Sequence, residues 1–156
     1  MAEPVFKEYA PNQPTFLPPS LDELLSETHM VRFVDHVIDQ MDLEPIISTY
    51  KGGGTSSYHP RMMLKVVVYG YVERITSCRV IAKATRERIP FMWLSGGQSP
   101  DFRTINNFRK DRLPGGGIKA VFTHVMQKLV ELELVDLADY TVDGTTLEAN
   151  ARRHSA

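Results

Sequence analysis

The sequence contains almost no cysteine and no long apolar run. Cys78 is the only cysteine in 156 residues, which excludes a disulfide within the chain and a zinc site made of cysteines. The five histidines show neither HxxxH nor HExxH spacing, so they predict no zinc site either. No apolar run approaches the roughly 20 residues that cross a membrane. The first eight residues carry acids where a signal peptide would have its apolar core. We therefore expect a cytoplasmic protein with no membrane contact.

The charge of the chain is unevenly distributed along its length. Its apolar and charged fractions, 42% and 24%, are ordinary, and its length allows one domain or one domain plus a fragment. Residues 1–60 carry three bases and nine acids, whereas residues 61–112 carry eleven bases and four acids, a formal charge of +7. A basic block in an otherwise acidic chain favours a surface that faces a polyanion. A helix face with solvated charges would give the same pattern.

Five prolines among residues 1–19 predict an extended arm that lies on the domain. After it, apolar residues recur at helical spacing almost to the end of the chain. Ser20 and Glu23 have the spacing of a capping box, which predicts a helix start. Residues 62–71 are apolar nearly all round and predict a buried central helix, with Pro60 in its first turn. Further helices are predicted over residues 28–41, 45–50, 77–87, 90–94, 101–110 and 118–133. In the helix over 77–87 we expect Val80, Ile81 and Ala84 to face inward.

The segment 101–110 has the chemistry of a DNA-reading helix. Phe102, Ile105 and Phe108 form an apolar stripe on one side. The other side carries side chains that contact base edges and phosphates in protein–DNA complexes: Arg103, Thr104, Asn106, Asn107, Arg109 and Lys110. With the preceding helix and the turn at Gly96-Gly97, this predicts a helix-turn-helix-like element, although helix pairs with polar outer faces are common. The rest of the basic block adds four candidate DNA contacts: Arg61, Lys65, Arg79 and Lys83.

The last apolar stretch, residues 139–142, predicts a β-strand that ends at Asp143-Gly144-Thr145. A carboxylate at the end of a strand is a common first ligand in metal-dependent phosphoryl-transfer folds. Taken alone, however, Asp-Gly is more often a turn than a metal site. The two interpretations of Asp143 stay open at this point.

Seven segments together resemble the DDE transposases of bacterial insertion sequences that have an InsH-type N-terminal domain. They are LPPSL (17–21), HMVRFV (29–34), YHPRMMLK (58–65), YGY (69–71), FMWLSGG (91–97), PDFRTI (100–105) and DGT (143–145). The resemblance implies that the helical region binds the terminal inverted repeats of the element as double-stranded DNA, in the bacterial nucleoid. A homodimer is left open. It also implies a ribonuclease H-like catalytic domain in which three acids bind Mg²⁺ or Mn²⁺. Asp143 matches the first of these acids, as a catalytic residue and metal ligand.

These observations predict a mainly α-helical protein of three parts. Residues 1–19 are the arm, residues 20–136 a DNA-binding transposase domain, and residues 137–156 the first strand or hairpin of a truncated ribonuclease H-like domain. With one acid of three, we expect no catalysis and no cofactor in this fragment. The alternative function is a helical protein–protein module, for dimerisation or inhibition of a transposase, with little DNA affinity.

Overall fold

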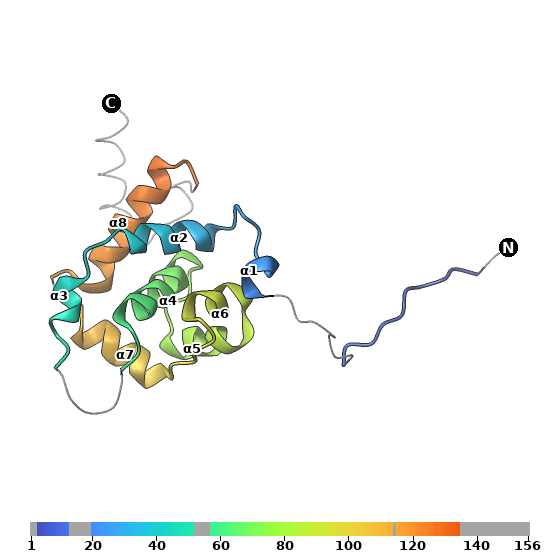
Figure 1. Ribbon diagram of the computed structural model, residues 1–156, viewed down its shortest axis with the longest axis horizontal. Helices are drawn as coiled ribbons and strands as arrows, with labels where there is room; N and C mark the ends of the chain where they lie inside the picture. The colour runs from blue at the N-terminus through green and yellow to red at the C-terminus, as the bar shows by residue number, and fades with distance from the viewer. Residues whose placement is uncertain (1–2, 13–19, 52–56, 114, 135–156) are drawn as a thin grey trace.

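The computed structural model describes residues 3–12, 20–51, 57–113 and 115–134. This part of the chain forms eight α-helices and no β-strand, which confirms a mainly helical fold (Figure 1). The helices are α1 (Leu21–Leu24), α2 (Met30–Asp39), α3 (Glu44–Ile47), α4 (Pro60–Val72), α5 (Cys78–Glu87), α6 (Ile89–Ser95), α7 (Phe102–Asp111) and α8 (Gly117–Glu131). The strand predicted over residues 139–142, and Asp143 after it, lie outside the described residues.

Helix α4 is the centre of the fold, as its apolar sequence predicts. It packs against α2 and α8 on one side and against α5, α6 and α7 elsewhere (Figure 1). Val66, Val67 and Leu64 are fully buried. Helix α4 begins at Pro60, and the His59 side chain caps it by accepting a hydrogen bond from the Arg61 backbone N–H at 3.0 Å. Five other helices thus pack around the apolar surface of α4, which forms the centre of the hydrophobic core.

Short polar residues set the helix ends that position the basic block. Ser77 caps α5, and Asp101 caps α7 by accepting from the Thr104 backbone N–H at 2.8 Å. Helix α6 ends at Gly96, whose φ of 61° is left-handed and therefore suits glycine. The chain then turns through Gly97, so that α7 packs beside α5. Helices α2 and α3 are shorter than predicted: residues 28 and 29 precede α2, and α3 ends at Ile47.

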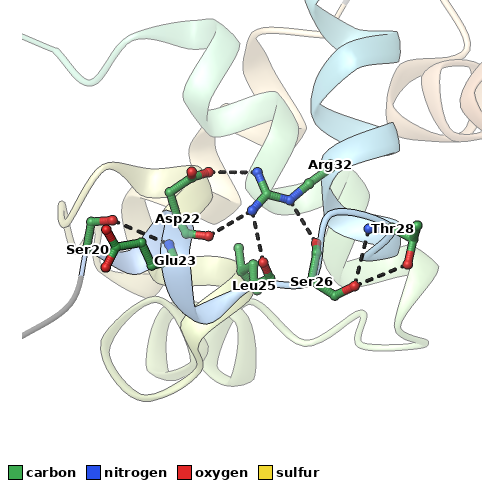
Figure 2. Close-up of polar contacts among 7 residues, drawn as sticks. All are labelled: Ser20, Asp22, Glu23, Leu25, Ser26, Thr28 and Arg32. Atoms are coloured by element: carbon green, nitrogen blue, oxygen red, sulfur yellow. Dashed lines mark hydrogen bonds and ion pairs between the residues drawn. The ribbon is translucent and has the colours of Figure 1, made fainter.

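A single arginine ties the start of the helical region to α2 and α6 (Figure 2). The Arg32 guanidinium donates to the Asp22 carboxylate at 2.7 Å and to the backbone carbonyls of Asp22, Leu25 and Ser26 at 2.8, 3.0 and 2.8 Å. It also lies 5.3 Å from the ring centroid of Trp93. Three of these acceptors are backbone carbonyls that lie in α1 or in the turn after it. Arg32 therefore holds α1 and the irregular segment that leads from it to α2.

Two predictions about burial are wrong. Val80 is 43% exposed, because the buried stripe of α5 runs through Cys78, Ile81, Ala82 and Thr85, and position 80 lies off that stripe. The described part of the arm, residues 3–12, does not lie on the domain: it has no helix or strand and extends away from the helices (Figure 1). Its large side chains Val5, Phe6 and Tyr9 are 84–95% exposed, so they contribute nothing to the core.

Gly70 allows α4 and α5 to approach each other closely, and Gly70→Ala tests this. A Cβ at this position would lie 2.9 Å from Ile81 Cδ1 and 3.2 Å from the Ile75 carbonyl oxygen. Alanine gains about 1 kcal/mol of helix propensity, but overpacking costs about 1–3 kcal/mol. We expect a net loss of about 1 kcal/mol in the free energy of unfolding, measured by urea denaturation. Adding Ile81→Val removes the clashing Cδ1 and should cost less in this background than alone. A Gly70→Ala protein more stable than the parent would contradict the close approach.

Candidate nucleic-acid interface

Helix α7 separates apolar and polar side chains as its sequence predicts. Ile105 and Phe108 are buried against the core. Four side chains of the predicted DNA-reading set are exposed to solvent: Arg103, Asn106, Asn107 and Lys110. The other two, Thr104 and Arg109, are half-buried. The helix therefore presents one arginine, one lysine and two asparagine amides on its outer side.

Helix α5 adds three exposed cations beside α7. Arg79, Lys83 and Arg86 recur at i, i+4 and i+7 along α5 and are all exposed. Lys83 is 3.9 Å from Glu87 on the same helix, a solvent-exposed pair of small energetic value. The structure thus brings the sequence candidates Arg79 and Lys83 to the same side of the fold as α7. We call the exposed residues of these two helices the α5–α7 face: Arg79, Lys83, Arg86, Arg103, Asn106, Asn107 and Lys110.

A groove of about 420 Å³ runs between the N-terminal end of α5 and helix α7. It is lined by Ser77, Cys78, Arg79, Phe102, Arg103, Asn106, Asn107 and Arg109. The guanidinium carbon of Arg79 lies 3.8 Å from the ring centroid of Phe102, and that of Arg103 lies 5.7 Å from it. These are cation–π contacts, so the Phe102 ring helps to fix both guanidinium groups.

A second hollow, of about 400 Å³, flanks α7 on its other side. It is lined by Tyr50, Ser57, Tyr58, Met63, Thr104, Asn107, Phe108, Asp111 and Arg112. Arg112 donates to the Thr49 carbonyl, and its guanidinium lies 4.1 Å from the Tyr50 ring centroid. Burial raises the pKa of the Tyr50 hydroxyl, and the charge of Arg112 offsets only part of that increase. Tyr50 therefore stays a neutral hydrogen-bonding group.

The Asp101 carboxyl, which caps α7, has a lowered pKa. Hydrogen bonds from the backbone N–H and side chain of Thr104 hold the pKa of this carboxyl below its usual range, and the charge of Arg103 acts in the same direction. The charged form thus stabilises the start of α7 at neutral pH. Because the pKa is lowered on folding, this contribution is present above the unfolded pKa and is lost as the pH falls through the folded one.

Three predicted DNA contacts have their charged groups engaged within the chain. Arg61 donates to the Ile38 carbonyl at 2.6 Å and so holds the C-terminal end of α2. Lys65 is 2.6 Å from Asp35 and 2.7 Å from Asp39, with its side chain only 13% exposed. Arg109 donates at 2.8 Å to the Tyr71 hydroxyl and to the Thr76 carbonyl. The structure therefore gives these three side chains partners on α2, α4 and the α4–α5 turn. Of the other candidates Thr104 is half-buried, and the rest are exposed: Arg79, Lys83, Arg103, Asn106, Asn107 and Lys110.

Sequence reasoning missed two features of this face. Arg86 lines a smaller hollow with Arg79 and Phe102, and its i, i+7 relation to Arg79 was the signal that could have identified it. Phe102 was assigned only to the apolar stripe, although its ring also supports two guanidinium groups. No local pattern distinguishes such a ring from an ordinary core residue.

The described residues contain no group of three or more histidine, cysteine, aspartate or glutamate side chains arranged to hold a metal ion. His29 and His59 instead cap α2 and α4, each accepting a backbone N–H at its Nδ1 atom. Asp143, the predicted metal ligand, lies outside the described residues. In the same part of the chain, none of the helices has the length and apolarity needed to cross a membrane.

Comparison with known proteins identifies the family. The model of the transposase domain (DUF772) matches residues 19–111, which is more than half of the chain and includes helices α1 to α7. No curated protein and no solved structure matches the chain. The matched region contains the whole α5–α7 face, the groove between α5 and α7, and every residue that lines the second hollow except Arg112. The chain therefore belongs to the transposase family defined by this domain.

Proposed function

We propose that the helical region is the N-terminal DNA-binding region of a DDE-class insertion-sequence transposase with an InsH-type domain. Its ligand is the terminal inverted repeat of the element, as double-stranded DNA. The observation that carries this proposal is the α5–α7 face, which joins five exposed cations to two exposed amides inside the family-matched region. This combination suits a ligand that offers both phosphates and base edges.

Within this proposal, the exposed residues divide by chemistry. Arg103, Asn106 and Asn107 on α7 have the planar donor groups that read guanine and adenine edges in a major groove. Lys83, Arg86 and Lys110 are flexible cations at the edges of the face and contact phosphates. In this arrangement α7, the turn at Gly96-Gly97 and the preceding helix act as a helix-turn-helix-like element.

The catalytic part of the proposal rests on the resemblance of DGT (143–145) to the first acid of the DDE set. Asp143 would supply a hard carboxylate oxygen to Mg²⁺ or Mn²⁺, which activates the attacking oxygen in phosphoryl transfer. In the resembled family, two further acids complete this site. Because Asp143 lies outside the family-matched region, we expect DNA binding by residues 20–134 not to depend on it.

The experiment is a binding titration with two duplexes, one carrying the terminal repeat of the encoding element and one of scrambled sequence. Arg103→Ala and Asn106→Ala are each expected to weaken repeat-end binding by about 1–3 kcal/mol and to reduce the preference over scrambled DNA. Lys83→Ala should weaken binding to both duplexes alike, because a phosphate contact carries no sequence information.

The matched control is Lys128→Ala, which removes an exposed cation of α8 that only pairs with Glu131 at 3.5 Å. It should bind both duplexes as the parent does. If the parent shows no affinity for either duplex at low salt, or if the α7 variants behave like Lys128→Ala, DNA binding by this face is refuted.

A second candidate function, a protein–protein module, is favoured by the exposed arm. Val5, Phe6 and Tyr9 are exposed apolar side chains in a segment that contains Glu3, Glu8 and Lys7, a charge balance unsuited to DNA. In this alternative a second copy of the chain covers the arm. Sedimentation equilibrium of the parent and of Phe6→Ser separates the two functions: self-association lost in the variant, without DNA binding by the parent, would favour the module.

A further inference from the structure

The groove between α5 and α7 has the composition of an anion site. Among the described residues that line it there are three arginines and two asparagines, and no aspartate or glutamate. The smaller hollow beyond Phe102 differs, because Asp101 is among its lining residues. An anionic group is therefore more strongly favoured in the groove than in the neighbouring hollow, although Arg79 and Phe102 belong to both.

Arg79 is the cation of this groove that is free to bind a ligand. Its guanidinium has no ion pair or hydrogen bond to the described residues, and it lies over the Phe102 ring, 3.8 Å from the ring centroid. By contrast, Arg109 already donates to Tyr71 and Thr76, and Arg103 lies close enough to Asp101 to lower the pKa of that carboxyl. Stacking on a ring fixes the plane of a guanidinium but leaves its N–H donors available, which reduces the entropy lost when it binds an oxyanion.

We propose that this groove binds one phosphodiester of the DNA backbone, with Arg79 as its ligand and Phe102 as a positioning residue for Arg79. The proposal rests on the DNA-binding function and adds to it a single fixed phosphate position. Asn106 lies in the same groove, so the amide that faces bases and the guanidinium that holds the phosphate are neighbours. A phosphate fixed here sets the register of α7 on the duplex.

The test is a scan of the repeat-end duplex with methylphosphonate, which replaces one charged phosphate at a time by a neutral group. For the parent protein, neutralisation at one position should lower affinity about tenfold, which is about 1.4 kcal/mol. For Arg79→Ala the same substitution should change affinity by less than about twofold, because the phosphate has already lost its partner. Lys128→Ala is the control and should keep the full sensitivity of the parent.

Phe102 is tested by the same scan. Phe102→Tyr keeps an aromatic ring under Arg79 and should keep the sensitivity, whereas Phe102→Leu should lose most of it while its helix content stays that of the parent. A merely structural role for the ring would weaken binding to all duplexes without removing the effect of this one phosphate. Since Arg79 is exposed, Arg79→Ala tests the groove even if Phe102→Leu does not fold.

The possible failures are distinguishable. If the parent binds the duplex but Arg79→Ala remains sensitive to every substitution that affects the parent, the phosphate site is refuted and DNA binding by the face stands. If the parent binds no duplex, the proposed function fails and this inference fails with it. A third outcome is that inorganic phosphate competes with the duplex at equal ionic strength, that Arg79→Ala abolishes this competition, and that no position in the duplex is sensitive. This outcome would assign the groove to a free phosphate and overturn the backbone site.

Discussion

Phe91→Ala is expected to lower the free energy of unfolding by about 3–5 kcal/mol. Phe91 is 1% exposed, and its ring centroid lies 4.9 Å from that of Tyr69, so it forms the contact between α6 and the central helix α4. Truncation removes both the buried ring and a tilted aromatic pair, and the helices around it cannot collapse fully into the cavity. Because a domain of this kind is stable by only about 5–15 kcal/mol, the loss is a large share of the total.

The measurement for Phe91 is urea denaturation followed by circular dichroism and by the fluorescence of Trp93, the only tryptophan. Ile89→Ala is the matched control, because Ile89 lies in the first turn of the same helix but is 37% exposed. We expect that control to cost less than about 1 kcal/mol. Equal losses in the two variants would contradict the assignment of Phe91 to the core of the α4–α6 contact.

Arg32→Met is expected to cost about 2–3 kcal/mol, the second largest effect. Methionine keeps the apolar stem near Trp93 but cannot donate to the carbonyls of Asp22, Leu25 and Ser26. Those carbonyls hold the segment before α2, so hydrogen exchange should rise most at residues 21–29. Denaturation gives the overall loss, and exchange shows where it acts.

Two further variants distinguish the parts of the Arg32 network. Asp22→Asn removes only the charge of a carboxylate that is 63% exposed and should cost less than about 1 kcal/mol. Arg32→Lys keeps the charge but has one ammonium for four acceptors that diverge. Its loss in the free energy of unfolding should therefore lie between the losses of Asp22→Asn and Arg32→Met. If Asp22→Asn costs as much as Arg32→Met, the ion pair and not the carbonyl contacts holds the segment.

Features set by neighbouring residues in the sequence were predictable. The Ser20 cap, the start of α4 at Pro60 and the apolar stripe of α7 all depend on groups no more than six residues apart, and the structure confirms each. The error at Val80 also has a local cause, because position 80 lies off the buried stripe that runs through Cys78, Ile81, Ala82 and Thr85.

The engagement of individual cations was not predictable. Three arginines donate hydrogen bonds to distant residues: Arg61 to Ile38, Arg109 to Tyr71 and Arg112 to Thr49. The partners are separated by 23, 38 and 63 residues in the sequence. A basic residue that holds a distant carbonyl and one that faces solvent have the same local pattern. Only the packing of α2 and α7 against α4 decides between them.

The engaged cations limit how strongly this chain can respond to salt. Residues 61–112 contain eleven bases, but the α5–α7 face presents only five of them: Arg79, Lys83, Arg86, Arg103 and Lys110. Each neutralised phosphate of a duplex releases condensed counterions, with a slope of about −0.9 in log K against log [salt]. One chain bound through this face would therefore show a slope no steeper than about −4.5, less than half of the slope expected if all eleven bases contacted phosphates. Lys65, held between Asp35 and Asp39, should displace no counterion from the duplex.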